Sequence, residues 1–436
     1  MTKNFPSEIR LPPVTKASGT VKLPGSKSIS NRALMLAALA SGRTRLTGLL
    51  RADDTERMLE SLTKLGVKVT ADGDSAQIEG AGGFFPVKSS KLFIGNAGTA
   101  ARTLTAALAF AGGHYRLDGI ERMRERPIGD LLAALRTLGA DITCEMREGF
   151  LPLVFRPAVS VGRRVSVRGN VSSQYLTALL LTAPLIAPDE GLEITVEGEL
   201  ISRPYIDITL AMMKIFGADV TVTKEGFRVA KGGYCAQEDY AVEGDASGAS
   251  YFLALGALTG GPVRVEGVGR HALQGDAAFA DVLEQMGAVI ARGDRYIEAS
   301  LPTGKVLKGI TLDCTKIPDA AMTLVPMALK TAGPVRLTGI ASWRVKETDR
   351  IAAMAAEMKK FGARVESGPD WIEVERGAAI TENVEVATYD DHRMAMSFSL
   401  AAAAGVPVVI KDPGCTAKTY PTYFSEFLRM IRSEVY

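Results

Sequence analysis

The sequence is poor in several residue types that would point to particular functions. It has four cysteines and three histidines in 436 residues, an aromatic content of 6%, and a formal net charge of only +2. The cysteines stand singly without CxxC spacing, which indicates reduced thiols in a cytosol rather than a disulfide framework. A net charge near zero gives no field that attracts nucleic acid or an anionic membrane. We therefore expect a cytoplasmic enzyme or binding protein with neither of these partners.

Long hydrophobic runs are also missing. The longest, residues 175–187, contains a proline and falls short of the roughly 20 residues that a membrane-spanning helix needs. The first residues, MTKNFPSEIRLPP, show neither an apolar signal segment nor the character of a transit peptide. The hydrophobic content of 47% is ordinary for a globular chain, and the length suits about two domains.

What the sequence does have is a pattern that recurs six times, at intervals of 68 to 76 residues. A polar cluster that can cap a helix precedes a helix-length run that is apolar nearly all round. A helix that is apolar on every face is buried, so the pattern predicts six buried helices. The six segments are SKSISNRALMLAALA, GNAGTAARTLTAALA, SSQYLTALLLTAPL, GDASGASYFLALGAL, IPDAAMTLVPMAL and DDHRMAMSFSLAAAA.

A second pattern recurs with similar spacing. An amphipathic helix ends at a glycine, and a strand follows. In residues 279–286 the apolar side chains fall at i, i+3, i+4 and i+7, as on one face of a helix, and the glycine fits the left-handed position after it. The repeated glycines are Gly66, Gly139, Gly217, Gly287 and Gly362.

Together the two patterns predict an α/β fold with mixed sheets, built from six βαβαββ-type repeats. Three repeats would form each of two similar domains, with the buried helices inside and the sheets outside, as an inside-out α/β barrel. We place one domain at residues 26–243 and the other at residues 244–436 with residues 1–25, and we expect the active site in the cleft between them. The sixth repeat is cut short by the C-terminus, and the segment before Leu23 is expected to pack with the second domain.

The polar helix starts are candidate anion sites, because the first N–H groups of a helix are unpaired and lie at the positive end of its dipole. Ser28, Ser30 and Asn31 are suitable caps, and Lys27 stands where an anion would dock. A nucleotide P-loop is disfavoured, because position 20 is threonine where that motif needs glycine.

Arginines follow three of the helix starts, where the helix dipole disfavours a cation. They are Arg32, Arg102 and Arg393. Bound anions would explain all three, although a solvated arginine that stacks on its own helix would explain any single one.

Two loops add further cations. Arg122, Arg124 and Arg126 alternate, so an extended loop would present them on one face, unless they form a solvated charged loop. In WRVKETDR, a helical segment would stack Lys346 on Arg350, a like-charge pair that favours an anion between them.

Among the acids, Glu347 is either a neutraliser of these cations or a general acid. Asp319 is either a helix cap or a functional carboxylate, and His392 could be a surface or capping residue. No spacing of histidine, cysteine and carboxylate indicates a metal site, and no serine or cysteine has a base partner in sequence. We expect no metal and no cofactor.

The motif series resembles that of the 5-enolpyruvylshikimate-3-phosphate (EPSP) synthase family, in order from about residue 20 to residue 423. The resemblance implies transfer of the enolpyruvyl group of phosphoenolpyruvate to the 5-hydroxyl of shikimate 3-phosphate, with release of phosphate through a tetrahedral intermediate. It also implies two domains with threefold repeats. The matching segments are LPGSKSISNR, GNAGTAAR, RMRERPIGDL, VSSQYLTALL, GDASGASYFLA, IPDAAM, WRVKETDR, DDHRMAM and CTAKTYP.

The resemblance also implies site residues. Asp319 is similar to the family's base at the attacking hydroxyl, and Glu347 with Lys27 to its proton donor. Shikimate 3-phosphate would be bound by Lys27, Ser28, Arg32, Ser172, Ser173, Gln174, Ser202, Tyr205, Asp319 and Lys346. Phosphoenolpyruvate would be bound by Lys27, Asn96, Gly98, Arg126, Gln174, Arg350, Arg393 and Lys418.

One position departs from the family pattern. The family commonly has proline where this chain has Thr103, and the change restores an N–H and frees φ in the helix beside Gly98. We therefore expect weaker inhibition by glyphosate, which resembles phosphoenolpyruvate in its occupancy of that pocket. Thr103→Pro should lower the glyphosate concentration that halves activity, and an unchanged value would contradict this expectation.

Two alternatives stay open. A UDP-N-acetylglucosamine enolpyruvyl transferase would share the fold, but that family typically uses a loop cysteine as acid, and residues 119–127 contain none. A phosphate-ligand binding protein without activity is disfavoured by the presence of Lys27, Asp319 and Glu347. A monomer is the default expectation.

Overall fold

The computed structural model describes residues 5–200 and 202–431. The predicted domain ranges also include residues 1–4, 201 and 432–436, which lie outside the described residues. The chain forms two compact lobes. The N-terminal lobe is Gly25–Val242, and the C-terminal lobe combines the segment up to Pro24 with the chain from Glu243 onward.

In the N-terminal lobe, the βαβαββ repeat occurs three times within the described residues. The first two strands of each repeat are parallel and flank a buried helix, and the last two form a hairpin that adds antiparallel to the second strand. The second repeat is β6 (Ser89–Phe93), α3 (Gly98–Phe110), β7 (His114–Asp118), α5 (Gly129–Thr137), β8 (Asp141–Cys144) and β9 (Leu153–Arg156), with the short helix α4 (Glu121–Glu125) before α5. The third is β10 (Arg164–Arg168), α6 (Ser173–Ile186), β11 (Leu192–Glu197), α7 (Arg203–Ile215), β12 (Val220–Val222) and β13 (Gly226–Val229).

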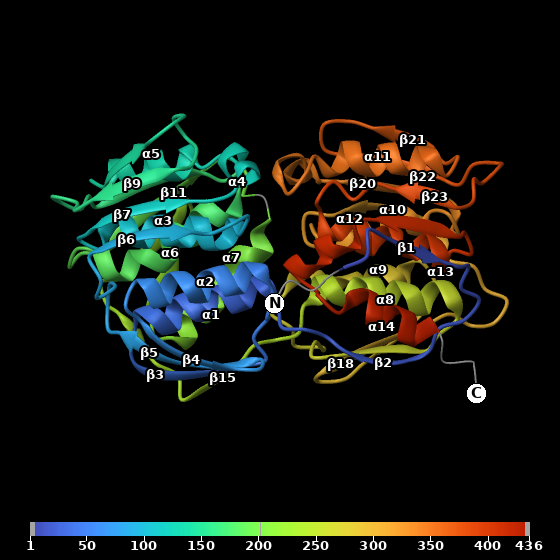
Figure 1. Cartoon of the computed structure of the whole chain (residues 1–436), viewed down its shortest axis with the longest axis horizontal. Helices are drawn as coiled ribbons and strands as arrows, with labels where there is room; N and C mark the ends of the chain where they lie inside the picture. The colour runs from blue at the N-terminus through green and yellow to red at the C-terminus, as the bar shows by residue number, and fades with distance from the viewer. Residues whose placement is uncertain (1–4, 201, 432–436) are drawn as a thin grey trace. The chain divides into compact units, whose positions relative to one another are not determined.

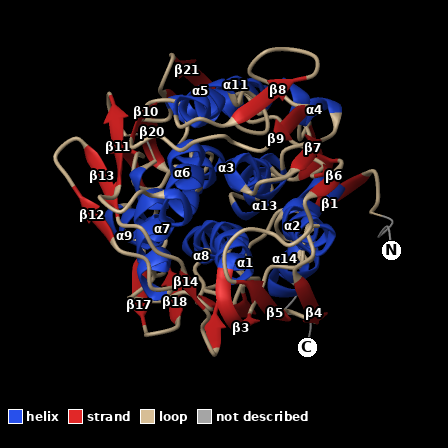
Figure 2. Ribbon diagram, turned by 90° about the vertical axis from the view of Figure 1, so that its left-hand side faces the viewer, coloured by secondary structure: helices blue, strands red, loops and turns tan. Residues whose placement is uncertain are grey.

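The first repeat is completed by the end of the lobe. Its opening strand is supplied by the segment that follows the third repeat. This segment pairs in parallel with the strand that follows the first buried helix. Its elements are β14 (Tyr234–Cys235), β15 (Asp239–Ala241), α1 (Lys27–Leu39), β3 (Ala40–Thr47), α2 (Asp53–Lys64), β4 (Lys68–Asp72) and β5 (Ser75–Ala81). In Figures 1 and 2 the helices α1, α3 and α6 lie inside this lobe and its strands at the periphery.

The C-terminal lobe repeats the plan, and the N-terminal segment supplies two of its strands. The strand β2 (Gly19–Lys22) pairs in parallel with β16, and β1 (Glu8–Leu11) pairs antiparallel with β24. The prediction that the segment before Leu23 packs with the second half is therefore confirmed. The fourth repeat is β2, α8 (Ala246–Thr259), β16 (Val263–Glu266), η1 (Gly275–Ala278), α9 (Phe279–Gln285), β17 (Val289–Arg292) and β18 (Tyr296–Ser300).

The fifth and sixth repeats depart from a single regular buried helix. Pro326 lacks an N–H, and the fifth helix starts as a 3-10 turn. The sixth is divided at Ser399. The fifth repeat is β19 (Lys308–Asp313), η2 (Ala320–Thr323), α10 (Leu324–Met327), β20 (Ala332–Thr338), η3 (Ala341–Val345), α11 (Arg350–Lys360), β21 (Arg364–Ser367) and β22 (Ile372–Glu375). The sixth is β23 (Val384–Val386), α12 (His392–Phe398), α13 (Leu400–Ala403), β24 (Val408–Lys411), η4 (Pro413–Lys418) and α14 (Tyr423–Ile431), with β1 in place of the hairpin.

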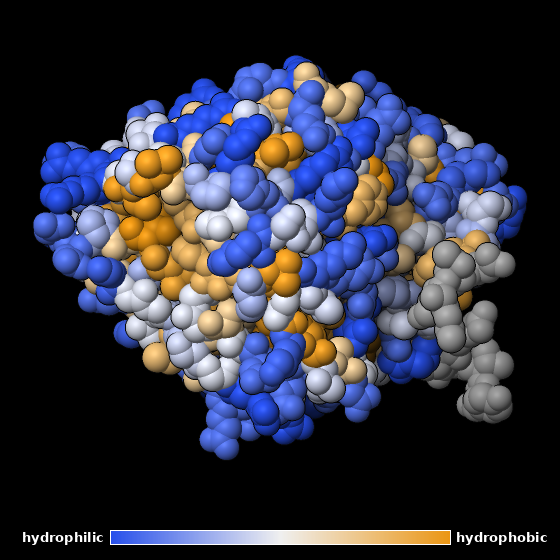
Figure 3. Space-filling model, turned by 60° about the vertical axis from the view of Figure 1, so that its left-hand side comes forward, coloured by the Kyte–Doolittle hydropathy of each residue, from blue (hydrophilic) through white to orange (hydrophobic). Residues whose placement is uncertain are grey.

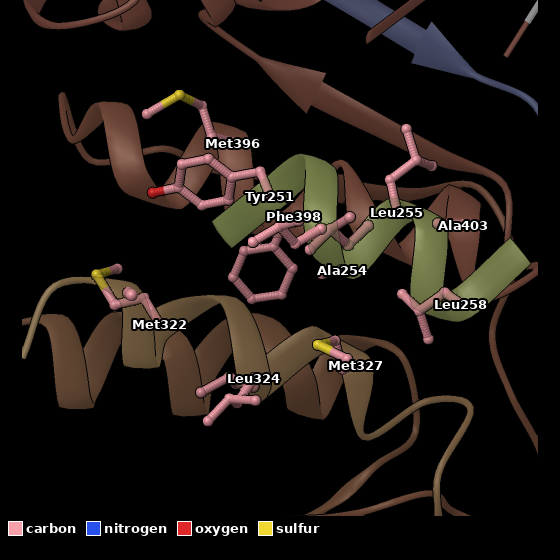
Figure 4. Packing of buried hydrophobic residues seen from close by; sticks show 14 of the residues in the cluster. Tyr251, Ala254, Leu255, Leu258, Met322, Leu324, Met327, Met396, Phe398 and Ala403 are labelled. Atoms are coloured by element: carbon pink, nitrogen blue, oxygen red, sulfur yellow. The ribbon is translucent and has the colours of Figure 1, made fainter. Parts of the chain in front are cut away.

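Hydrophobic burial explains why the repeated helices lie inside. Every residue of α8 is buried, and Figure 4 shows side chains of α8 facing those of η2, α10, α12 and α13. The face drawn in Figure 3 is mostly hydrophilic, and its hydrophobic areas are limited and separate. Among the described residues no helix is long and apolar enough to cross a bilayer. The predicted fold class, with mixed sheets and helices buried inside two lobes, is confirmed.

Three local predictions were wrong. Ser26, not Ser28, caps α1, because its hydroxyl accepts from the N–H of Ile29. Residues 121–125 form the helix α4 rather than an extended loop, so their arginines do not share one face. Lys346 and Arg350 do not share a helix, because η3 ends at Val345 and α11 begins at Arg350.

Candidate functional site

In the N-terminal lobe, Arg32 of α1 is buried against α6 and α7. Its guanidinium donates to the Ser28 carbonyl at 2.8 Å, to the hydroxyls of Thr209 and Thr177 at 2.8 and 3.1 Å, and to the Tyr205 carbonyl at 3.0 Å. Within residues 5–200 and 202–431 no carboxylate pairs with it. Burial consequently lowers the pKa of Arg32 to about 10. A bound anion would supply the missing negative charge.

Arg126 is another buried arginine of this lobe, and it lies on the start of α3. Its Nη1 donates to the side-chain oxygen of Asn96 at 3.3 Å. A Cβ on Gly98 would meet its Nη2 at 2.7 Å, so only glycine lets the guanidinium approach the helix this closely. The part of the chain that the structure describes offers Arg126 no carboxylate. Unpaired N–H groups of α3 and this guanidinium therefore make one anion-binding arrangement.

Arg102 differs from Arg32 and Arg126 in what it contacts. It donates to the carbonyl oxygens of Pro127 at 2.7 Å and Gly98 at 3.4 Å, and so ties the residues after α4 to α3. The hydroxyl of Tyr175 donates to the same Pro127 carbonyl at 2.7 Å. Tyr175 was missed in the sequence because it reads as one more apolar residue of α6. Thr103 lies in the second turn of α3, where its hydroxyl donates back to the Thr99 carbonyl at 3.0 Å.

The remaining candidates of this lobe lie at the starts of α1, α6 and α7. The Nζ of Lys27 is 3.8 Å from a carboxylate oxygen of Asp54. The Ser172 hydroxyl accepts from the N–H of Gln174 at 3.3 Å, and Ser173 is the first residue of α6. Ser202, just before α7, has a left-handed φ of 55°, which is unusual for a residue other than glycine.

In the C-terminal lobe, Asp319 is surrounded by cations. Its carboxylate accepts from Arg350 at 2.9 Å and from Arg393 at 3.2 Å, and the Nζ of Lys346 is 3.8 Å away. Its side chain makes no cap hydrogen bond to η2, so the interpretation as a helix cap is wrong. Burial lowers the pKa of Lys346, and Asp319 opposes that effect.

Glu347 is buried in the same cluster. One carboxylate oxygen is 3.0 Å from Nη2 of Arg350, and the other is 3.2 Å from Nζ of Lys418. Glu347 is thus held by cations from two segments that are 68 residues apart in sequence, and Arg350 joins it to Asp319.

Asp391 is a functional candidate that sequence reasoning missed. Its carboxylate accepts from Nε of Arg350 at 2.8 Å and caps α12 by accepting from the N–H of Arg393 at 2.9 Å. Burial alone would lower the pKa of Arg350, but Asp391, Glu347 and Asp319 together raise it. The signal for Asp391 in the sequence was its position just before a helix, where an aspartate is interpreted as an ordinary helix cap. His392, next to it, is fully buried, so the interpretation as a surface residue is wrong.

The structure therefore joins six of the predicted residues in one charged cluster of the C-terminal lobe, and each of them forms an ion pair with another member. They are Asp319, Lys346, Glu347, Arg350, Arg393 and Lys418. No group of three potential metal ligands occurs among the described residues. The arrangement suits anion binding combined with proton transfer between buried carboxylates and a substrate.

Comparisons with known proteins agree with this chemistry. The family model described as EPSP synthase (3-phosphoshikimate 1-carboxyvinyltransferase) matches residues 11–427. Proteins named 3-phosphoshikimate 1-carboxyvinyltransferase from Cellvibrio japonicus and Burkholderia multivorans are each 56% identical, over 97% of this chain and 99% of theirs. An EPSP synthase structure from Acinetobacter baumannii has a TM-score of 0.80 at 27% identity and covers 97% of this chain and 98% of its own.

A more distant structure shares only the fold. The enolpyruvyl transferase NikO from Streptomyces tendae has a TM-score of 0.74 at 17% identity, with 98% of each chain covered. From the match over nearly the whole length and the identity to curated relatives, the chain belongs to the EPSP synthase family.

Proposed function

We propose that this chain transfers the enolpyruvyl group of phosphoenolpyruvate to the 5-hydroxyl of shikimate 3-phosphate and releases phosphate. The observation that carries the proposal is the buried cluster in which Asp319 and Glu347 are both held by Arg350. Such a cluster offers cations to an anionic substrate and two carboxylates for proton transfer. Family membership adds the substrate pair.

The reaction needs one base and one acid. Asp319 takes the proton of the 5-hydroxyl while that oxygen attacks C2 of phosphoenolpyruvate, and Glu347, with Lys27, gives a proton to C3. The resulting tetrahedral intermediate then returns a proton from the new methyl group to the Glu347 carboxylate and expels phosphate as the bond between C2 and the phosphate oxygen breaks. The hydrogen bonds from Arg350 and Arg393 hold Asp319 for the first step.

Binding is assigned to both lobes. We assign phosphoenolpyruvate to Lys27, Asn96, Gly98, Arg126, Gln174, Arg350, Arg393 and Lys418. We assign shikimate 3-phosphate to Lys27, Ser28, Arg32, Ser172, Ser173, Gln174, Ser202, Tyr205, Asp319 and Lys346. Arg32 and Arg126 are buried, and among the described residues neither has a carboxylate partner, which supports anionic ligands in the N-terminal lobe.

Charge explains why so many cations are needed. Two like charges 4 Å apart repel by about 4 kcal/mol at an effective dielectric near 20, and both substrates are polyanions. Cations must offset this repulsion before positioning can contribute its roughly 7–11 kcal/mol.

Release of phosphate from phosphoenolpyruvate in the presence and absence of shikimate 3-phosphate tests the proposal. We expect release only when shikimate 3-phosphate is present, together with a product that carries the enolpyruvyl ether. Release that depends on UDP-N-acetylglucosamine would favour the related transferase instead. Binding of both substrates without release would indicate a binding protein.

We also propose that the chain is a cytoplasmic monomer that does not bind nucleic acid. The four unpaired cysteines support a reducing compartment, and the net charge of +2 argues against nucleic acid. Light scattering after gel filtration would test the monomer, because a dimer would double the measured mass.

A further inference from the structure

Glu357 is a fully buried acid for which the proposed reaction has no use. It lies on α11 and accepts three hydrogen bonds: from the hydroxyl of Tyr389 at 2.7 Å, from the N–H of Ala387 at 3.2 Å, and from Nζ of Lys360 at 2.6 Å. Two of the three donors belong to the short segment between β23 and α12. A buried carboxylate is expensive unless it is paired and hydrogen-bonded, so this one is fixed in place.

The segment that Glu357 holds has an unfavourable backbone. Tyr389 and Asp390 have φ values of 55° and 53°, two successive left-handed residues, neither of which is glycine. Such a conformation is energetically unfavourable for a residue with a side chain and persists only where surrounding contacts impose it. Immediately after them come Asp391, which caps α12 and pairs with Arg350, and Arg393.

The helix α11 contacts this segment twice. Arg350 and Glu357 are seven residues apart, two helical turns, and so lie on one face. Arg350 reaches Asp391, while Glu357 reaches Ala387 and Tyr389. The two left-handed residues therefore lie between two points of attachment to the same helix.

We propose that Glu357 and Tyr389 are positioning residues, which hold the left-handed segment so that Asp391 keeps Arg350 directed at Asp319 and Glu347. The inference rests on the proposed function for its substrates. Tyr389 is 44% exposed, and its hydroxyl hydrogen bond to Glu357 is therefore a contact whose loss changes packing little. Burial and the hydrogen bond to Glu357 raise the pKa of Tyr389 to about 12, which keeps the hydroxyl a donor.

Tyr389→Phe tests the proposal with the least disturbance. We expect the KM for phosphoenolpyruvate to rise about fivefold, the size of effect that one hydrogen bond contributes, while the KM for shikimate 3-phosphate changes less than about twofold. Glu357→Gln should act in the same direction. The double variant should be no worse than the more affected single variant if both changes act through the hydrogen bond that Tyr389 and Glu357 share.

Tyr234→Phe is the matched control. It removes a tyrosine hydroxyl bond of similar length, 2.8 Å to the Leu181 carbonyl in the N-terminal lobe, and neither residue is a proposed site residue. It should lower the melting temperature and leave both KM values unchanged. If Tyr389→Phe and Glu357→Gln likewise lowered only the melting temperature, the two residues would be merely structural and the proposal would be overturned.

A binding measurement separates this inference from the proposed function. The buried Trp343 donates to the Pro318 carbonyl, next to Asp319, so its fluorescence can report inorganic phosphate bound at the cluster. If the unmodified chain released no phosphate from phosphoenolpyruvate, the proposed function would fail. Weaker phosphate binding by Tyr389→Phe would then still support the positioning role, and unchanged phosphate binding would contradict it.

Discussion

In the N-terminal lobe, Arg32 and Arg126 are buried among neutral groups, whereas in the C-terminal lobe Arg350 and Arg393 lie against carboxylates. The surroundings of the first pair leave positive charge unbalanced, which costs folding free energy and favours a bound anion. The surroundings of the second pair fix the arginines and place acids beside them. One repeated fold thus carries two kinds of cationic site: the first suits binding, and the second also suits proton transfer.

Of the changes that test this comparison, Asp319→Asn should have the largest effect on activity. The amide keeps the shape of the carboxylate but cannot take a proton, so we expect kcat to fall by about 10²–10⁴-fold at saturating substrates. Asp313→Asn, an exposed aspartate of β19, serves as control and should leave kcat unchanged. If steady-state kinetics showed that Asp319→Asn lowers kcat less than about tenfold, the proposal that Asp319 is the base would be contradicted.

Replacing one arginine in each lobe by methionine tests the difference in charge balance. Arg350→Met leaves Asp319, Glu347 and Asp391 without a main partner, and we expect the free energy of unfolding to fall by about 3–5 kcal/mol. Arg32→Met deprives no acid of its partner among the described residues, and the Thr177 and Thr209 hydroxyls still contact each other, so a loss of about 1–2 kcal/mol is expected. Denaturant unfolding that gave equal losses would show that the two environments do not differ in energy.

Asp276 makes the stability of the C-terminal lobe depend on pH. This carboxyl is buried in η1, contacts the Ser247 hydroxyl, and has its pKa raised to about 7 by burial and by the nearby Asp319. Because the folded pKa exceeds the unfolded value, the stabilisation is complete below about pH 4 and is lost as the pH rises through 7. Relative to Asp276→Asn, the unmodified chain should therefore lose about 3 kcal/mol of unfolding free energy between pH 4 and pH 7.

The control for this pH dependence is Asp281→Asn, which changes an aspartate of α9 whose side chain is 61% exposed. A surface ion pair contributes little, so this variant should keep the slope of the unmodified chain. Equal slopes for the unmodified chain and Asp276→Asn would show that Asp276 is not the group responsible.

The fold was predictable because its signals are local and repeated. Helices that are apolar on all faces must be buried, and glycines at helix ends mark where each strand begins, so six repeats follow from spacing alone. The strand that completes the first repeat was not predictable, because β14 and β15 are very short and pair with β3 almost 200 residues away. The helix α4 was also missed, since alternating arginines fit a strand as well as a short helix.

The sequence offers Asp319 and Glu347 as candidates for the proposed site, but it does not show how they pair. Only the fold shows that Arg350 joins them. Asp391 was missed because a cap residue and an ion-pair partner look alike in sequence, and Arg350 is 41 residues away. The left-handed Tyr389 gives no local signal, since its conformation is imposed by the tertiary contact with Glu357.

The central proposal is that the N-terminal lobe contributes mainly binding and the C-terminal lobe also contributes proton transfer. Steady-state kinetics of Glu347→Gln and Arg126→Lys, measured in parallel, test this proposal most directly. Arg126 is preferred to Arg393 here, because Arg393 also contacts Asp319, and its loss would disturb the proposed base. We predict that Glu347→Gln lowers kcat at least about 100-fold with little change in the KM for phosphoenolpyruvate, because an acid is lost. Arg126→Lys should raise that KM about tenfold or more with little change in kcat, because an ammonium group cannot make the bidentate contact that a guanidinium group can make with an anion. The reverse outcome, with Glu347→Gln altering only KM and Arg126→Lys only kcat, would contradict the account.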